Sequence, residues 1–227
     1  MEIPRSFAIR SRVNAPLSAP DRVSGSPPGL RWVGFLVLLL GSLHLPAPAL
    51  ATSVAPPTFA ELIAESQLIV RARVQAVRAA WVDSPQGRVI KTYVTVSVLK
   101  PLKGPAPTEL TLELLGGEID GHGMQVAGMP RFEVGRTEFL FISGNGVRFC
   151  PLVGMMHGRY RILTDPDTAR DYVARDDRIP LESVHDVQLP QPGNALALRF
   201  KHSDRALTPL AFEQLITGEI LRHAARP

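Results

Sequence analysis

The sequence predicts a mainly β protein, built either as a closed or nearly closed barrel or as a sandwich. Three observations lead to this prediction. Apolar and polar residues alternate in several short segments. Gly- and Pro-rich turn signals separate these segments at intervals of about 8–12 residues. Helical patterns occur only at the two ends of the predicted domain.

The two end helices have recognisable starts. Thr58 and Glu61 have capping-box spacing, which predicts a short helix over 58–66. Thr208 is followed by Pro209, and this pair predicts the start of a C-terminal helix. The apolar stripe of the first helix comprises Phe59, Leu62 and Ile63, and that of the second comprises Phe212, Leu215, Ile216 and Ile220.

Period-two alternation predicts strands over residues 68–78, 89–100 and 108–115. The turn between the first two of these strands falls at residues 83–87. Residues 139–142 are apolar at every position, which indicates a central strand buried on both faces.

The second half of the chain shows two hairpin patterns. Ser143-Gly144-Asn145-Gly146 predicts a tight turn, after which residues 147–153 pair back on the preceding strand. Residues 159–163 and 170–174 flank a turn that contains Asp165-Pro166-Asp167, which predicts the next hairpin.

The N-terminal part has the pattern of an export signal. Arg31 precedes an apolar run from Trp32 to Leu45, and Ala49, Ala51 and Thr52 define a small-residue cleavage site. We expect cleavage after Ala51 and export to the periplasm or the outside of the cell. An uncleaved signal anchor is the alternative, although the run is short for a bilayer core of about 30 Å. The long leader before the run is explained by a misplaced start codon or by a long n-region.

These patterns divide the chain into four parts. Residues 1–51 hold a disordered leader and the signal, 52–185 the β-barrel domain, 186–207 a linker, and 208–227 a helix that docks on the barrel. The membrane is expected to be contacted only through the signal.

The charge balance argues against a nucleic-acid partner. The whole chain has 25 basic and 21 acidic residues, and its signal segment holds five Arg and two acidic residues. The remaining 20 basic and 19 acidic residues nearly cancel, so no strong field is expected over the domain. The chain has one cysteine, Cys150, which excludes an intramolecular disulfide.

Motifs for nucleophilic catalysis, phosphate binding or a zinc ribbon are missing from the sequence. We therefore expect a protein that is not an enzyme and needs no cofactor. Cys150, Met155 and His157, with Met156 between the last two, are soft ligands of the kind that suits a copper(I) site. A buried thiol beside apolar methionines is the simpler interpretation.

The glycine-rich segment 116–130 is the best candidate for partner contacts, as either a long hairpin or a mobile loop. Its polar residues Glu118, Asp120 and His122 would suit acid–base catalysis or a divalent cation. Solvation of a surface loop explains them more simply. Its possible apolar anchors are Met124, Val126 and Met129.

Two other groups of polar residues do not complete a functional motif. Asp165, Asp167 and Asp171 begin like a calcium loop, but Ala169 and Arg170 occupy the positions where a ligand and a glycine are required. Turn chemistry explains them better. His185-Asp186 lacks an identifiable third member of a catalytic triad.

Three blocks resemble netrin-like modules, the group that includes the tissue inhibitors of metalloproteases. Residues 66–74 are similar to their first strand, 93–104 to their second strand with its Lys-Gly end, and 132–141 to a later strand. The same blocks resemble a set of exported bacterial proteins of unknown function. The resemblance covers about residues 58–164 and implies an OB-like barrel of five to six strands without a catalytic site.

The mechanism of those inhibitors does not transfer. They chelate the protease zinc through an N-terminal cysteine, whereas the predicted mature chain begins at Thr52. We therefore expect an exported binding domain whose protein partner is unidentified, with a protease as one candidate. The alternatives are a metal carrier or hydrolase-type enzyme and a structural envelope subunit. The residues expected to serve the carrier or enzyme are Glu118, Asp120 and His122, or Cys150, Met155 and His157.

Overall fold

The computed structural model describes residues 55–85, 87–191 and 201–225. The strands of the main sheet are β1 (Leu68–Ser84), β2 (Gly87–Lys103), β3 (Glu109–Leu115), β6 (Thr137–Ile142), β7 (Arg159–Thr164) and β8 (Asp171–Arg175). A separate hairpin consists of β4 (Gly117–Ile119) and β5 (His122–Met124). The helices are α2 (Phe59–Glu65) and α4 (Pro209–Ala224), with 3-10 turns η1 (Met155–Gly158) and η2 (Val184–Gln188).

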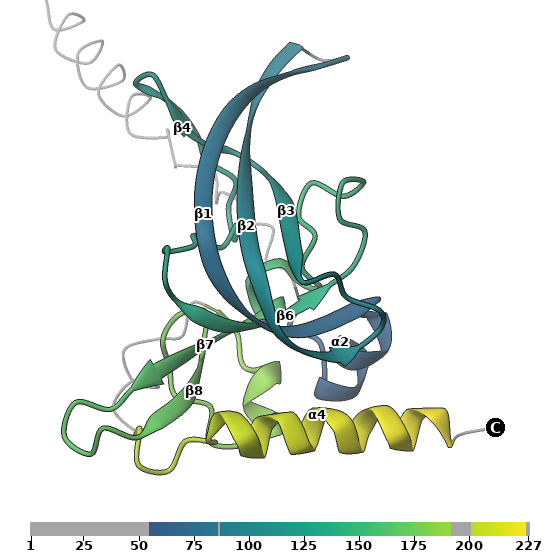
Figure 1. Ribbon diagram of the computed structural model, residues 1–227, viewed down its shortest axis with the longest axis vertical. Helices are drawn as coiled ribbons and strands as arrows, with labels where there is room; N and C mark the ends of the chain where they lie inside the picture. Colours follow the sequence, from purple (N-terminus) through teal and green to yellow (C-terminus); the bar gives the residue numbers. More distant parts are fainter. Residues whose placement is uncertain (1–54, 86, 192–200, 226–227) are drawn as a thin grey trace, which may run out of the picture. The chain divides into compact units, whose positions relative to one another are not determined.

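The six main strands form one antiparallel sheet in the order β3-β2-β1-β6-β7-β8 (Figure 1). The mainly β class predicted from the alternation is therefore confirmed, as are the two end helices. β1 and β2 pair along almost their whole lengths and are longer than the strands predicted over 68–78 and 89–100. Three register shifts interrupt their pairing, and such bulges bend a strand and increase its twist.

The predicted caps form. In α2, the Thr58 amide donates to Glu61 Oε2 at 2.8 Å, and the Glu61 amide donates to Thr58 Oγ1 at 3.1 Å. At α4, Ala211 N donates to the hydroxyl of Thr208 at 3.2 Å. These bonds satisfy backbone donors that have no partner within the helix.

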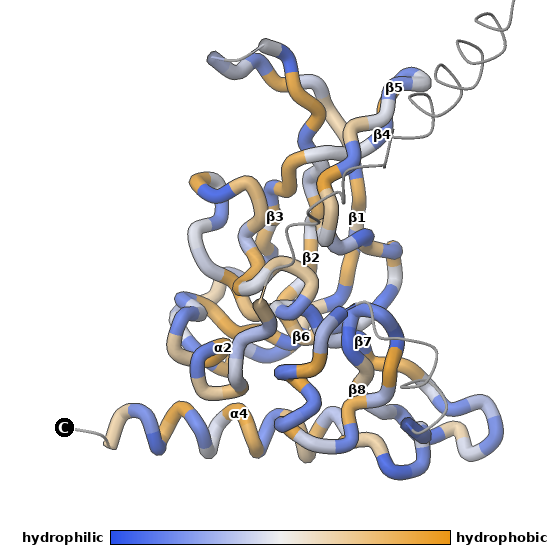
Figure 2. The backbone as a smooth tube through the Cα atoms, turned by 180° about the vertical axis from the view of Figure 1, so that it is seen from behind, coloured by the Kyte–Doolittle hydropathy of each residue, from blue (hydrophilic) through white to orange (hydrophobic). Residues whose placement is uncertain are grey.

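Side-chain alternation separates two hydrophobic clusters on opposite faces of the sheet. One cluster, which we call the outer cluster, includes Ile69, Phe139 and Phe141 and packs against the helices. The other, the inner cluster, includes Val70 and Leu140 from the same strands. Figure 2 shows apolar residues recurring along β1, β2, β3 and β6. β6 is therefore buried on both faces, as its apolar sequence predicted.

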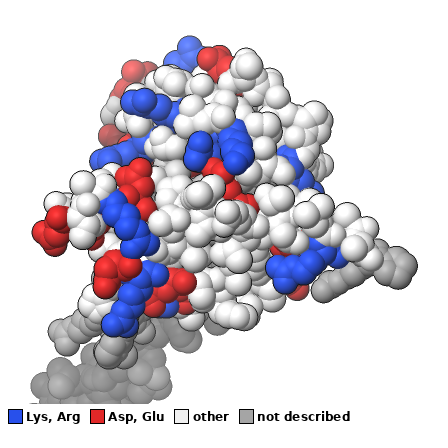
Figure 3. Space-filling view, turned by 60° about the horizontal axis from the view of Figure 1, so that its bottom comes forward, with Lys and Arg blue, Asp and Glu red and all other residues white. Residues whose placement is uncertain are grey.

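Helix α4 packs on the outer cluster through Phe212 and Ile216, and the buried charge of Glu213 adds a second attachment. The ring centroid of Phe212 lies 5.1 Å from that of Phe139. Glu213, which is 3% exposed, receives a hydrogen bond from Lys100 Nζ at 2.5 Å. Its other carboxylate oxygen lies 2.8 Å from Arg71 Nη1, an ion pair outside hydrogen-bond geometry. Figure 3 shows acidic and basic side chains interspersed around an uncharged area on the face turned forward from the bottom of Figure 1.

The segment 147–153 differs from its predicted strand. It makes one isolated bridge, Ile142 to Leu152, and Val147 is 89% exposed. The reason lies in Asn145, whose side chain accepts from Glu113 N at 3.1 Å and donates to Thr111 O at 2.8 Å. The turn thus binds the edge of β3 instead of starting a regular hairpin.

The closed form of the predicted barrel is wrong. The edge strands β3 and β8 do not pair within the described residues. Each edge is met by a loop instead. Leu115 N at the end of β3 donates to Phe149 O at 2.8 Å, and Val173 N in β8 donates to Leu207 O at 2.8 Å. Such cover protects strand edges from unwanted pairing.

Candidate partner-binding groove

A cavity of about 530 Å³ lies between the main sheet and the glycine-rich segment that follows β3. Its size is within the range of ligand pockets. The lining residues that matter most here are Val77, Thr92, Leu114, Met124, Val126, Met129, Pro130 and Phe132, with Glu118 and Arg131 as its charged members. We call this cavity the groove. Its side chains are mostly apolar, but glycine backbone and other polar groups make up a large part of its surface.

Two glycines turn the chain from β3 into the wall of the groove. Gly116 has φ +97°, and a Cβ there would lie 2.7 Å from Met124 O. Gly117 has φ +141°, and a Cβ there would lie 2.4 Å from the hydroxyl of Thr92. That hydroxyl donates to Gly116 O at 2.7 Å. Only glycine fits these close approaches of backbone to backbone and side chain.

The segment then forms the β4–β5 hairpin, the first of the two forms that the sequence allowed. Asp120 and Gly121 both have positive φ, 52° and 74°, as a type I′ turn requires. His122 Nδ1 lies 3.0 Å from Asp120 O, and its ring meets Trp81 edge-on at a centroid distance of 5.6 Å. The imidazole therefore packs on the main sheet.

The groove brings together four of the six sequence candidates for partner contacts. Glu118, Met124, Val126 and Met129 line it, whereas Asp120 and His122 lie in the turn and second strand of the hairpin that borders it. Glu118, Asp120 and His122 are all exposed.

The far wall of the groove rests on the 3-10 turn η1. Gly128 has φ +76°, and a Cβ there would lie 2.7 Å from the terminal methyl of Met156 and 3.6 Å from that of Met155. The two methionines thus support the glycine-rich segment from behind. Packing against Gly128 is therefore a sufficient structural role for Met155 and Met156.

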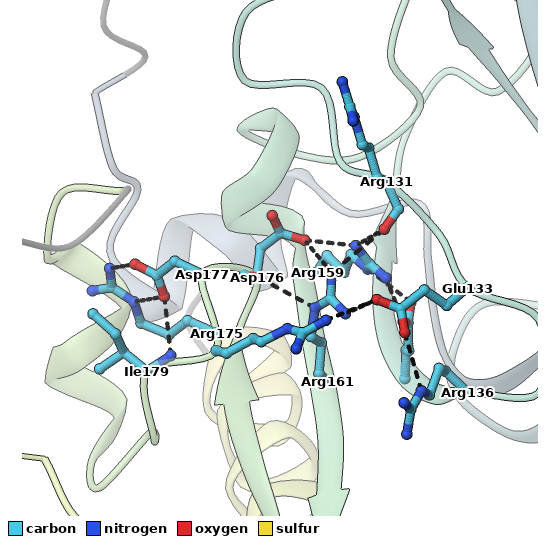
Figure 4. A network of polar contacts seen from close by, with 11 residues as sticks. Arg131, Glu133, Arg136, Arg159, Arg161, Arg175, Asp176, Asp177 and Ile179 are labelled. Carbon is cyan, nitrogen blue, oxygen red and sulfur yellow. Dashed lines mark hydrogen bonds and ion pairs between the residues drawn. The ribbon is translucent and has the colours of Figure 1, made fainter. Parts of the chain in front are cut away.

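Sequence reasoning missed a charged network around Arg159, which contacts Arg131 (Figure 4). Arg159, which is 0% exposed, donates to Glu138 through Nε at 2.8 Å and through Nη2 at 2.5 Å. Its Nη1 donates to Asp176 at 2.7 Å and to Arg131 O at 2.6 Å. Its guanidinium also stacks on Phe132, 4.3 Å from the ring centroid.

Burial opposes the charge of Arg159, but Glu138 and Asp176 outweigh it, so the pKa of the guanidinium is raised above its usual value. Glu133 extends the network by accepting from Arg161 at 3.2 Å and from Arg178 at 2.9 Å. The hydrogen bond from Arg161 is the main cause that lowers the pKa of Glu133. The network ties residues 131–133 to β6 and β7, and this fixes one end of the groove. The alternation of Arg159 and Arg161 in an otherwise apolar region was its one sequence signal.

The residues proposed above as copper(I) ligands make separate structural contacts. Cys150 belongs to the inner cluster, against which Met155 packs. Burial raises the pKa of the Cys150 thiol to about 11. His157 is 1% exposed, and its Nδ1 lies 3.3 Å from Gln191 Nε2. The described part of the chain contains no group of three or more His, Cys, Asp or Glu that could hold a metal ion.

Asp165 directs a turn, as its sequence context indicated. Its Oδ1 accepts from the amides of Asp167 and Thr168 at 3.0 and 2.9 Å, and its Oδ2 accepts from Ser203. The Ser203 hydrogen bond is the main cause that lowers the pKa of Asp165 to about 2. Asp171 accepts separately from Thr164 at 2.7 Å.

Asp186, the other acidic candidate, is occupied by structural contacts. It accepts from the Ser183 amide at 3.0 Å at the start of η2, and it pairs with Lys201 at 2.9 Å. Arg175 Nη1 donates to its carbonyl oxygen at 3.2 Å. These contacts explain why the dipeptide His185-Asp186 forms part of a packed turn.

The predicted cleavage site at Ala49, Ala51 and Thr52 lies outside the described residues, as do residues 192–200 of the predicted linker. Within the ranges that the structure describes, neither helix has the length and apolar character needed to cross a membrane. The chain matches no protein-family model, and a comparison with characterised proteins finds no significant match.

Proposed function

We propose that this chain is an exported, non-enzymatic binding module that holds a segment of a protein partner in the groove. The observation that carries the proposal is the groove itself, a cavity of about 530 Å³ between the main sheet and a segment that is attached at both ends. Gly116 and Gly117 fix its start, and the Arg159 network fixes its end. A preformed apolar site loses little conformational entropy when it binds.

The lining favours an apolar segment of a partner. Met124, Val126 and Met129 offer polarisable and aliphatic contacts, and methionine adapts to partners of different shape. Glu118 and Arg131 place one acid and one base among the lining residues, both exposed. Charges in such positions set orientation and association rate more than affinity.

We also propose the finer fold, a partly open OB-like barrel related to netrin-like modules. Residues 143–153 support it because they bridge two strands that do not pair directly. Ser143 N donates to Pro151 O and Val153 N donates to Phe141 O on the β6 side, and Leu115 N donates to Phe149 O on the β3 side. A ring of strands and one irregular segment then surrounds the inner cluster. If the chain is related to netrin-like modules, a protease is one candidate partner.

The groove is tested by charge substitution. Met124→Glu and Val126→Glu place a carboxylate in the cavity, and each should reduce capture of the partner from the native culture by at least about tenfold. Val147→Glu is the matched control, since Val147 is exposed and does not line the groove. The amount of each captured protein is measured by mass spectrometry, together with the melting temperature of each variant. Equal capture by all three variants and the wild type would reject the groove as the site.

A further inference from the structure

The outer halves of β1 and β2 form a two-stranded arm. Its β1 half is Ala76–Ser84, and residues 77–84 of β1 pair with residues 87–94 of β2. β6 pairs only with Leu68–Arg73 of β1, and two backbone bonds to residues 135 and 136 extend that contact to Val74. From Ala76 onward no other strand pairs with this edge of β1 among the described residues. Figure 1 shows the arm continuing past β3 and β6.

One face of the arm is occupied. A methyl group added at Gly117 would lie 3.4 Å from Cβ of Ala79, and His122 contacts Trp81. The β4–β5 hairpin therefore covers the face that carries Ala79 and Trp81. The opposite face carries Arg78, which is exposed, and Ala80 and Val82, which are half-buried.

The free edge has the features that natural edge strands usually avoid. It runs for nine residues, longer than an average strand of about 5–6 residues. It contains no proline, and its only charged residues are Arg78 and Asp83. Backbone N–H and C=O groups along such an edge can accept another strand, and two-stranded ribbons alone are marginally stable.

We propose that the Ala76–Ser84 edge pairs with the same edge of a second copy of this chain, antiparallel about a two-fold axis. Every copy supplies this edge, and an antiparallel pair of identical strands satisfies both edges at once through an isologous contact. The charges favour this direction. Antiparallel pairing brings the Arg78 end of one strand towards the Asp83 end of its copy, whereas parallel in-register pairing would place Arg78 beside Arg78.

The first test is the mass in solution. Sedimentation velocity over about a hundredfold range of concentration should show the wild-type chain passing from monomer to dimer. Ala80→Lys puts two like charges near the two-fold axis and should weaken dimerisation by at least about tenfold. Val147→Lys adds the same charge at an exposed site outside the arm and should leave dimerisation unchanged. Circular dichroism of each variant checks that it folds.

The second test locates the contact and does not depend on Ala80→Lys. In a Cys150→Ala background, cysteine is introduced singly as Arg78→Cys, Ala80→Cys or Val82→Cys, all on the face opposite the β4–β5 hairpin. The variant nearest the axis should form a disulfide-linked dimer under mild oxidation, because directly paired strands bring Cα atoms to about 4.5–5.5 Å. Val147→Cys is the control and should remain monomeric.

Three outcomes would overturn the proposal. If the wild-type chain stays monomeric throughout the concentration series, a second copy does not pair with this edge. A dimer that survives Ala80→Lys and is not linked by any of the three arm cysteines uses another surface. A monomeric chain that binds an extended apolar peptide along this edge, with loss on Ala80→Lys, would replace the second copy by a peptide partner. None of these outcomes depends on the groove variants Met124→Glu and Val126→Glu.

Discussion

Arg159 and Glu138 form a two-point ion pair inside the sheet, with hydrogen bonds of 2.8 and 2.5 Å and no exposed surface on either side chain. They lie on the neighbouring strands β7 and β6. A buried guanidinium needs such a partner because an unpaired charge at this depth would lose its hydration without compensation. The same guanidinium holds Arg131 O at 2.6 Å, and so this pair also determines where the groove ends.

Removing one partner of this pair should be strongly destabilising. Glu138→Gln leaves the Arg159 charge buried and poorly compensated, and we expect a loss of about 3–5 kcal/mol in the free energy of unfolding. Urea denaturation measures this quantity. Asp83→Ala is the control, measured at a protein concentration that keeps the chain monomeric. Its pair with Arg88 is exposed and 3.8 Å long, so we expect a change below about 0.5 kcal/mol. A similar small loss in both variants would contradict a structural role for the buried pair.

Acid should destabilise the protein through His157. Burial is the main cause that lowers the pKa of His157 to about 4, with Arg175 as a second cause. Well above pH 6.5 the residue is neutral in both the folded and the unfolded chain. As the pH falls from about 6.5 towards 4, the unfolded chain binds a proton that the folded chain does not, so stability is lost at up to about 1.4 kcal/mol per pH unit.

The variant His157→Gln isolates this effect, since its side chain has no titration in that range. We expect a shallower fall of unfolding free energy between pH 6.5 and 4 than in the wild type, measured by denaturant titration at several pH values. Val147→Gln serves as the control, because it introduces the same side chain at an exposed site without removing a titratable group, and it should keep the wild-type slope. Identical slopes for wild type and His157→Gln would assign the acid sensitivity elsewhere.

Two glycine-to-alanine variants should shift stability in opposite directions. Gly116→Ala forces a Cβ to 2.7 Å from Met124 O at φ +97°, and it should destabilise the fold by about 1–3 kcal/mol and disturb the groove. Gly218→Ala lies inside α4 with nothing within 4 Å of its Cβ, and it should stabilise by about 0.5–1 kcal/mol. Thermal unfolding of the two variants beside the wild type measures both; a shift of the same sign in both would refute the prediction.

The single thiol should be unreactive in the native protein. Cys150 is 4% exposed, and burial raises its pKa to about 11, so little thiolate is present at neutral pH. We expect a thiol reagent to label Cys150 only after the chain opens, at a rate that rises with denaturant and parallels unfolding. Rapid stoichiometric labelling in buffer alone would mean that the inner cluster is open around Cys150.

The sequence alone determined the local elements, because their signals involve residues close together in the chain. Thr58 and Glu61 cap α2 within one turn, and Thr208 with Pro209 starts α4. Alternation predicted the strand that carries Ile69 and Val70, whose side chains lie on opposite faces of the sheet, and the uniformly apolar run 139–142 indicated a strand buried on both. The single cysteine excluded an internal disulfide without any structure.

Only the tertiary structure decided how distant segments meet. Asn145 binds the backbone of β3, 32 and 34 residues away, and this replaced the strand predicted over 147–153. Glu138, Arg159 and Asp176 are separated by 21 and 17 residues, and their pairing depends on strand order. Pairing energies between remote groups depend on distance and burial, which local periodicity does not encode. For this reason the sequence identified the glycine-rich segment as a candidate for partner contacts, and only the tertiary structure showed that it forms a groove with the main sheet.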